Sequence, residues 1–129
     1  MNRRGFLWAA VVAGLALGVR GPAEEPARDP ETVIRTALRA RRHLEFIYHD
    51  HVRLVEPHAL GRLRDGTVVL LAWQVAGGSR SEPPPGWCSF LVAGISGLAL
   101  TRENFTPRAD YRPEKTKLRE ILAEVAHRE

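Results

Sequence analysis

The stretch LEFIYHDHVRLVEPH, residues 44–58, decides the fold because large apolar side chains recur at every second position from Leu44 to Tyr48. A period of two is typical of a β-strand. Asp50-His51 supplies a tight turn, and a second strand is expected from Val52 towards Leu63. Pro57 has no amide hydrogen to donate, so it marks a bend or a sheet edge. The stretch therefore predicts a β-hairpin.

Three more strands are expected after this hairpin. Asp65-Gly66 is a hairpin signal, because glycine tolerates the positive φ of a type I′ turn. The apolar run 67–75 predicts a strand that is buried on both faces. A loop rich in glycine and proline, 76–86, separates it from a fourth strand at 87–92. A fifth strand is expected at 95–100, where neighbouring glycines permit a bulge.

Helices are expected before and after the strands. Asp29 offers an N-cap and Pro30 the favoured first position of a helix that ends near Arg42. At the other end, residues 114–129 carry apolar side chains at helical spacing and predict a C-terminal helix. One helix, five short strands and a last helix predict a mainly β domain, either a small closed barrel or a strongly bent sheet.

The N-terminus has the residue order of an export signal. Arg3 and Arg4 precede an apolar run that begins at Phe6 and Leu7 and ends at Val19. The run is about 14 residues long, short of the ~20 that a membrane-spanning helix needs, which favours a removable signal over an anchor. The two arginines followed by Gly-Phe-Leu are similar to a twin-arginine signal.

These features divide the chain into four parts. We expect a twin-arginine-like signal peptide at 1–23, a linker at 24–29, a β domain at 30–113 and a C-terminal helix at 114–129. We therefore expect the protein to be exported to the periplasm. The alternative is a protein that stays tethered to the membrane by an uncleaved N-terminal segment. Oligomeric state is not indicated by the sequence.

Charge gives little support to nucleic-acid binding. The net charge of +4 falls to about +1 without residues 1–23, since 16 basic residues then oppose 15 acidic ones. Phosphate binding normally needs a clustered basic face. The first helix does carry four arginines that could touch phosphates, although a solvated helix surface explains them equally well. These arginines are Arg35, Arg39, Arg41 and Arg42.

Three ordered motifs resemble those of the WYL domain family. They are Val55-Glu56-Pro57-His58, Gln74-Val75-Ala76-Gly77-Gly78-Ser79 and Gly86-Trp87-Cys88-Ser89-Phe90, and the tail 105–111 fits the same group. The resemblance covers residues 33–101 and is greatest to short stand-alone bacterial members. It implies a small five-stranded Sm- or SH3-like barrel with a leading helix.

Departures from the family pattern affect the expected ligand. The Trp-Tyr-Leu tripeptide aligns with 68–70, where only Leu70 remains. Typical members carry arginines around the fourth strand that are thought to hold a ligand, often a nucleotide or nucleic acid. Those positions are Cys88, Leu91 and Gly94 here. Because a guanidinium is hard to replace in holding phosphate or carboxylate, the usual anionic ligand is in doubt.

Six polar or aromatic residues are candidates for a ligand pocket at the mouth of the barrel. They are Arg53, Glu56, His58, Gln74, Ser79 and Trp87. A few polar groups in an apolar wall are typical of small-ligand sites. The alternative is structural: Arg53 pairs with Glu56 or a helix carboxylate, His58 bonds backbone, and Trp87 belongs to the core.

Other site chemistries have weaker signals. Zinc could be bound by side chains of the types found at His49, Asp50, His51, Glu56 and His58. Their spacing matches no metal motif, so no metal or cofactor is expected. For catalysis, Ser79 with His58 is the only pairing, oriented by Glu56, and it lacks a Gly-x-Ser-x-Gly context. The lone Cys88 forms no intrachain disulfide and is expected to be a core thiol.

The sequence therefore predicts a non-catalytic, exported, WYL-like binding module for a small ligand or a protein partner. One alternative is a cytoplasmic accessory or regulatory protein that binds nucleic acid or nucleotides through an arginine-rich face. Another is an interaction protein that docks through its C-terminal helix.

Overall fold

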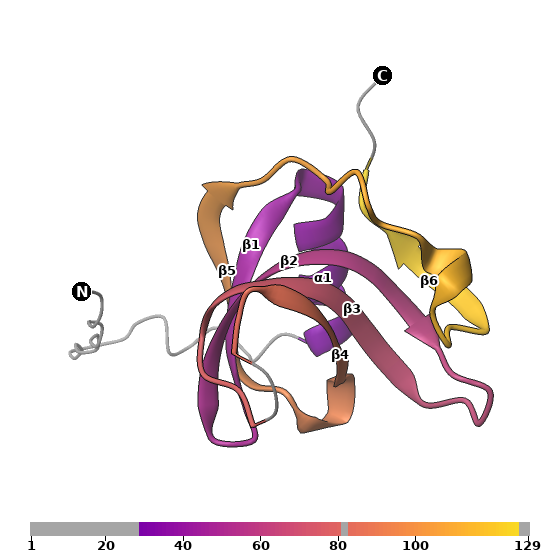
Figure 1. The fold of residues 1–129 in the computed structure, drawn as a ribbon, viewed down its shortest axis with the longest axis horizontal. Helices are drawn as coiled ribbons and strands as arrows, with labels where there is room; N and C mark the ends of the chain where they lie inside the picture. The colour runs from indigo at the N-terminus through magenta and orange to yellow at the C-terminus, as the bar shows by residue number, and fades with distance from the viewer. Residues whose placement is uncertain (1–28, 81–82, 127–129) are drawn as a thin grey trace.

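The computed structural model describes residues 29–80 and 83–126, so the predicted export-signal residues Arg3, Arg4, Phe6 and Leu7 lie outside it. Figure 1 shows a strongly curved sheet with one helix packed against it. The elements in chain order are α1 (Pro30–Ala40), β1 (Arg42–Tyr48), β2 (His51–Arg62), β3 (Val68–Gly77), β4 (Gly86–Leu91), the 3-10 turn η3 (Val92–Gly94), β5 (Ser96–Asn104), the 3-10 turn η4 (Pro113–Lys115) and β6 (Glu120–Glu124).

Helix α1 begins where its capping residues predict. The carboxylate of Asp29 accepts a hydrogen bond from the amide of Thr32 at 3.2 Å, and Pro30 occupies the first turn. Arg41 then takes a left-handed conformation, with φ of 54°, which ends the helix one residue before β1 begins. The apolar face of α1 buries Ile34 and Leu38 against the sheet. The expected leading helix is confirmed.

The β1–β2 hairpin is confirmed, but its turn lies one residue earlier than expected. His49 and Asp50 have φ values of 51° and 65°, and Tyr48 pairs directly with His51. Positive φ at both central residues is the requirement of a type I′ turn, and histidine and aspartate are among the residues that tolerate it. Such a turn matches the twist of the two strands that it connects.

The Asp65-Gly66 hairpin is also present, with a different turn. Gly66 has φ of 90°, whereas Asp65 is not among the described residues with positive φ. The Gly66 amide donates to the Leu63 carbonyl at 2.9 Å, and the Leu63 amide donates to the Thr67 carbonyl at 2.9 Å. This is a three-residue loop with glycine in the left-handed position, and not a two-residue type I′ turn.

The sheet is antiparallel and is not closed into a barrel. The strand order is β4-β3-β2-β1-β5, with β6 paired to β2. The mainly β class is therefore confirmed, but no ladder joins β4 to β5 in the described residues and the five-stranded barrel is not formed. A side chain of β1 reaches β4 directly, because the Tyr48 hydroxyl accepts a hydrogen bond from the Leu91 amide at 3.0 Å.

The prediction of a C-terminal helix is wrong, because residues Glu120–Glu124 form strand β6. The pairing of β1 with β2 ends at Val55, and beyond it the same edge of β2 would otherwise expose its backbone groups. Strand β6 pairs with Ala59 to Arg62 of β2 along that edge. A register shift between Pro57 and Ala59, where a bend was expected, separates the two halves of β2.

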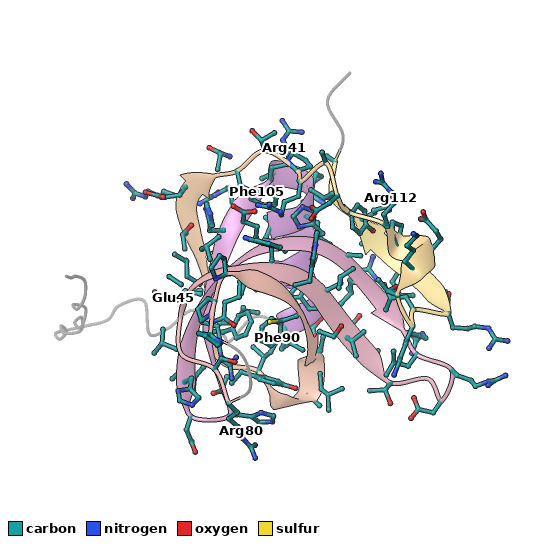
Figure 2. The ribbon with its side chains drawn as sticks, viewed as in Figure 1. Arg41, Glu45, Arg80, Phe90, Phe105 and Arg112 are labelled. Carbon is teal, nitrogen blue, oxygen red and sulfur yellow. The ribbon has the colours of Figure 1, made fainter. Side chains whose placement is uncertain are left out.

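Aromatic residues fill the interior of the curve. The ring of Phe90 contacts those of Phe46 and Tyr48 edge to face, with centroids 5.0 Å apart in both pairs. Figure 2 shows Phe90 in the interior beneath β4. Because Val125, which follows β6, is also buried in this core, the C-terminal segment belongs to the same domain as the sheet.

Candidate functional site

The six predicted site residues fall on opposite faces of the sheet. Arg53 pairs in register with Phe46, and Gln74 pairs with Val55, so both lie on the core-facing side. Glu56 pairs with Trp73 on the other side. Successive side chains of a strand point to opposite faces, and this separates Arg53 from Glu56 and His58.

Arg53 and Gln74 form a buried polar cluster in the interior. Their exposed fractions are 4% and 1%. The guanidinium of Arg53 donates to the Tyr48 carbonyl at 2.9 and 3.2 Å and to Gln74 Oε1 at 3.2 Å. It also lies 5.5 Å from the ring centroid of Tyr48 and 5.6 Å from that of Phe90. Arg53 therefore pairs with a carbonyl, an amide and two rings, and not with Glu56 or a helix carboxylate.

The Gly-Gly-Ser loop is fixed by Gln74. Its amide Nε2 donates to the Ala76 carbonyl at 3.0 Å and to the Gly78 carbonyl at 2.9 Å. Gly77 has φ of 103° and approaches the backbone of β2 closely, so a side chain would clash there. Ser79 follows, half-buried, next to this turn. The glycines thus serve the turn.

A small cavity of about 230 Å³ lies beside this cluster. Gln74, Trp87, Cys88 and the Pro83–Pro85 segment line it, with Gly86. Burial raises the pKa of the Cys88 thiol, so the sulfur stays protonated near neutral pH. Cys88 behaves here as a half-buried apolar side chain.

His58 is fully buried, with both ring nitrogens bonded inside the protein. Because the Arg108 amide donates to Nε2 at 3.0 Å, Nδ1 carries the hydrogen, which it donates to the Glu56 carbonyl at 2.9 Å. Burial lowers the pKa of His58 and favours this neutral form. The ring packs against those of Trp87, Phe105 and Tyr111, with centroids 4.9, 5.3 and 5.4 Å away.

Glu56 lies close to His43 on the same side of the sheet as His58. Its Oε2 is 3.7 Å from His43 Nε2, while Oε1 is buried with no hydrogen-bond partner among the described residues. Burial raises the pKa of Glu56, against the opposing effects of His43 and Arg108. No group of three or more His, Cys, Asp or Glu in residues 29–80 and 83–126 is arranged to hold a metal ion.

Residues 105–111, which we call the strap, cross this side of the sheet. The guanidinium of Arg108 lies 3.7 Å from the centroid of the Trp73 ring and donates to Asp110 at 3.3 Å. The indole of Trp87 donates to the other carboxylate oxygen of Asp110 at 3.4 Å. At the end of the strap, the Tyr111 hydroxyl donates to Glu124 of β6 at 2.8 Å. These bonds hold the strap between β3, β4 and β6.

A second cavity, of about 290 Å³, lies where the strap ends, and we call it the aromatic cavity. Its lining residues are Leu71, Trp87, Asp110, Tyr111, Arg112, Lys115 and Thr116. Leu71 and the two aromatic residues supply an apolar wall. Arg112 donates to the carbonyls of Ala109 and Tyr111 at 3.0 and 3.1 Å, and Figure 2 places it on the segment that leads into β6.

Charge around the aromatic cavity is uneven. Within the described part of the chain, neither Arg112 nor Lys115 forms an ion pair. The one acidic side chain, Asp110, is already bonded by Arg108 and Trp87. The cavity thus combines an apolar wall with two cations that form no ion pair with any described residue, while the carboxylates of Glu114 and Glu124 act on the Tyr111 hydroxyl. The sequence predicted only Trp87 of this set as a site residue, although Asp110 and Tyr111 belong to the tail 105–111 that fits the WYL-like pattern.

Three of the four arginines of the first helix and its end are engaged inside the molecule. Arg35 donates to the Leu122 carbonyl at 3.2 Å, Arg41 to the Ala126 carbonyl at 3.3 Å and Arg42 to the Thr101 carbonyl at 2.7 Å. These bonds hold α1, β5 and the C-terminal segment together. Phosphate groups would have to compete with them.

Comparison with known proteins supports the fold alone. The backbone resembles part of a solved structure, proteasome accessory factor B/C (PafBC) of Arthrobacter aurescens, with a TM-score of 0.55 and 20% sequence identity. The similarity covers 69% of this chain and 14% of that one. No family model matches the chain, and neither does any curated protein sequence. None of the helices in the described residues has the length and hydrophobicity to cross a membrane.

Proposed function

We propose that the protein is a non-catalytic, WYL-like binding module whose aromatic cavity takes a small organic anion. The observation that carries the proposal is the pairing of a Trp87–Tyr111 wall with the cations of Arg112 and Lys115. An apolar wall with a few directed polar groups is the usual composition of a small-ligand site. The three ordered WYL-like motifs and the backbone similarity to part of PafBC support the class of module.

The first test uses two dyes that differ in charge, the anion 1-anilinonaphthalene-8-sulfonate and neutral N-phenyl-1-naphthylamine. Lys115→Ala is expected to weaken binding of the anionic dye about three- to tenfold, since an exposed charge contributes roughly 1 kcal/mol. Binding of the neutral dye should stay within about twofold. Fluorescence titration of the full chain measures both.

The matched control is Arg102→Ala, which removes the same charge from an exposed position of β5, outside the aromatic cavity. It should leave both affinities unchanged. Equal losses in the two variants would indicate a general charge effect, and no loss in Lys115→Ala would place the dye elsewhere. Circular dichroism of each variant checks that the fold is intact, because this dye also binds molten states.

We propose further that the module acts outside the cytoplasm. A reporter fused behind residues 1–30 is expected to reach the periplasm, because the leader has a charged start, an apolar run and small residues after it. Replacement of Arg3 and Arg4 by lysine should block export if the twin-arginine route is used. Cell fractionation measures this, and retention of the unmodified fusion in the cytoplasm would end the proposal.

A regulatory role in the cytoplasm is the second proposal. The backbone similarity to an accessory factor supports it, and Arg39 of α1 has no bond within the described residues. Binding to an oligonucleotide would have to fall steeply with added salt, because released counterions drive such binding.

A further inference from the structure

A third hollow, which we call the basic hollow, lies between the tip of the β2–β3 hairpin and the segment that leads into β6. Its lining residues are Leu63, Arg64, Asp65, Lys117 and Arg119, and its volume is about 580 Å³. Figure 1 shows the two segments side by side, and the Arg119 amide donates to the Arg62 carbonyl at 2.6 Å. Segments that are distant in sequence therefore build this surface together.

Its charge is positive and largely uncompensated. Arg64, Lys117 and Arg119 are exposed, and none of them forms an ion pair within residues 29–80 and 83–126. The single acidic residue, Asp65, accepts a hydrogen bond from the Thr67 amide at 2.9 Å, which holds its carboxylate in the turn. The neighbouring Arg62 differs, because it pairs with Glu120 at 3.6 Å.

The hollow also offers apolar surface. Leu63 is half-buried in its lining, and the aliphatic stems of lysine and arginine cover further apolar area while their charged ends stay in water. A purely phosphate ligand would use the three cations and leave this surface uncovered. A chain segment with acidic residues around one apolar side chain would satisfy both.

We propose that the basic hollow binds an acidic segment of a protein partner, with an apolar side chain of that segment against Leu63. Charge complementarity of this kind speeds association and selects partners more than it adds affinity. Exposed ion pairs are individually weak, so the contact is of the transient class. The proposal is independent of the aromatic cavity.

The test measures binding of a fluorescein-labelled peptide, Glu-Glu-Leu-Glu-Glu, to the full chain by anisotropy at low salt. The double variant Lys117→Ala/Arg119→Ala is expected to weaken binding at least tenfold. Arg39→Ala/Arg102→Ala removes the same charge from exposed sites elsewhere and should change the affinity less than twofold. Replacing the peptide leucine with serine should weaken binding three- to tenfold, because the contact with Leu63 is lost.

Three results would overturn the proposal. Equal losses in both double variants would show a general charge effect. Equal affinities for the leucine and serine peptides would show that contact with Leu63 does not contribute to binding. Tighter binding of an oligothymidine with the same number of charges would assign the hollow to nucleic acid. Lys115→Ala, which alters the aromatic cavity, should leave peptide binding unchanged, so the two sites can fail separately.

Discussion

Replacement of His58 with alanine is expected to lower the free energy of unfolding by about 3–5 kcal/mol, a large part of the roughly 5–15 kcal/mol that stabilises a native protein. The imidazole is 0% exposed and packs against three aromatic rings, so its removal leaves a cavity. The change also leaves the Glu56 carbonyl and the Arg108 amide without their partner. Urea denaturation followed by circular dichroism measures the loss.

A phenylalanine at the same position separates packing from hydrogen bonding. His58→Phe fills most of the space but removes both hydrogen bonds, so a smaller loss of about 1–3 kcal/mol is expected. A loss below about 1 kcal/mol in His58→Ala would contradict the packing role. Retained stability with lost dye binding would instead support the sequence hypothesis that His58 contacts a ligand.

The pH dependence of stability gives an independent check on His58. Its pKa is lowered in the folded state, so between the folded and unfolded pKa values the unfolded chain binds more protons. The stabilising contribution of the neutral ring is present above the unfolded pKa of about 6.5 and is lost as pH falls towards the folded value. Facing groups are Glu56, Arg108 and Asp110, with Tyr111 and its partner Glu124. His58→Phe should flatten this part of the profile.

Local sequence signals predicted the elements whose cause is local. Asp29 and Pro30 specify the start of α1, and the alternation from Leu44 to Tyr48 specifies β1. The turns were harder to predict in detail. His49 and Asp50 adopt positive φ although neither is glycine, because the register of Tyr48 with His51 requires it.

Long-range pairing explains the expectations that failed. Residues around Ile121 have helical spacing, yet they form β6, because the second half of β2 lacks β1 as a neighbour on that edge. No local sequence pattern shows that an edge of β2 lacks a neighbouring strand. The missing pairing between β4 and β5 could not be predicted from local sequence either, because closure of a barrel depends on how far the whole sheet curves.

The sequence alone could have shown that two of the predicted site residues lie on opposite faces of the sheet. Arg53 and Glu56 differ by an odd number of positions on one strand, so the period of two already places them on opposite faces. The strap could not be placed in this way. Its position over Trp73 and Trp87 depends on contacts of Arg108 and Asp110 with distant strands.

Arg53→Ala is expected to lower the free energy of unfolding by about 3–5 kcal/mol, because two buried acceptors lose the guanidinium donor and the packed volume of the side chain is lost as well. Arg53 is buried, and no carboxylate pairs with it in the described part of the chain. Its charge is stabilised by the Tyr48 carbonyl, by Gln74 Oε1 and by two aromatic rings. Thermal and urea unfolding measure the change.

The conservative variants decide which property of Arg53 matters. Arg53→Lys keeps the charge but loses the fork that reaches both acceptors, so a loss of about 1–3 kcal/mol is expected. Arg53→Met keeps volume without charge, removes the guanidinium from the Tyr48 carbonyl and leaves Gln74 Oε1 with the weak donor Cys88 Sγ at 3.9 Å. If Arg53→Met is as stable as the natural protein, the free energy needed to desolvate the buried cation is as large as the stabilisation from its hydrogen bonds. Arg53 would then be retained for a purpose other than stability, and dye and peptide titrations of Arg53→Met would show whether that purpose is binding.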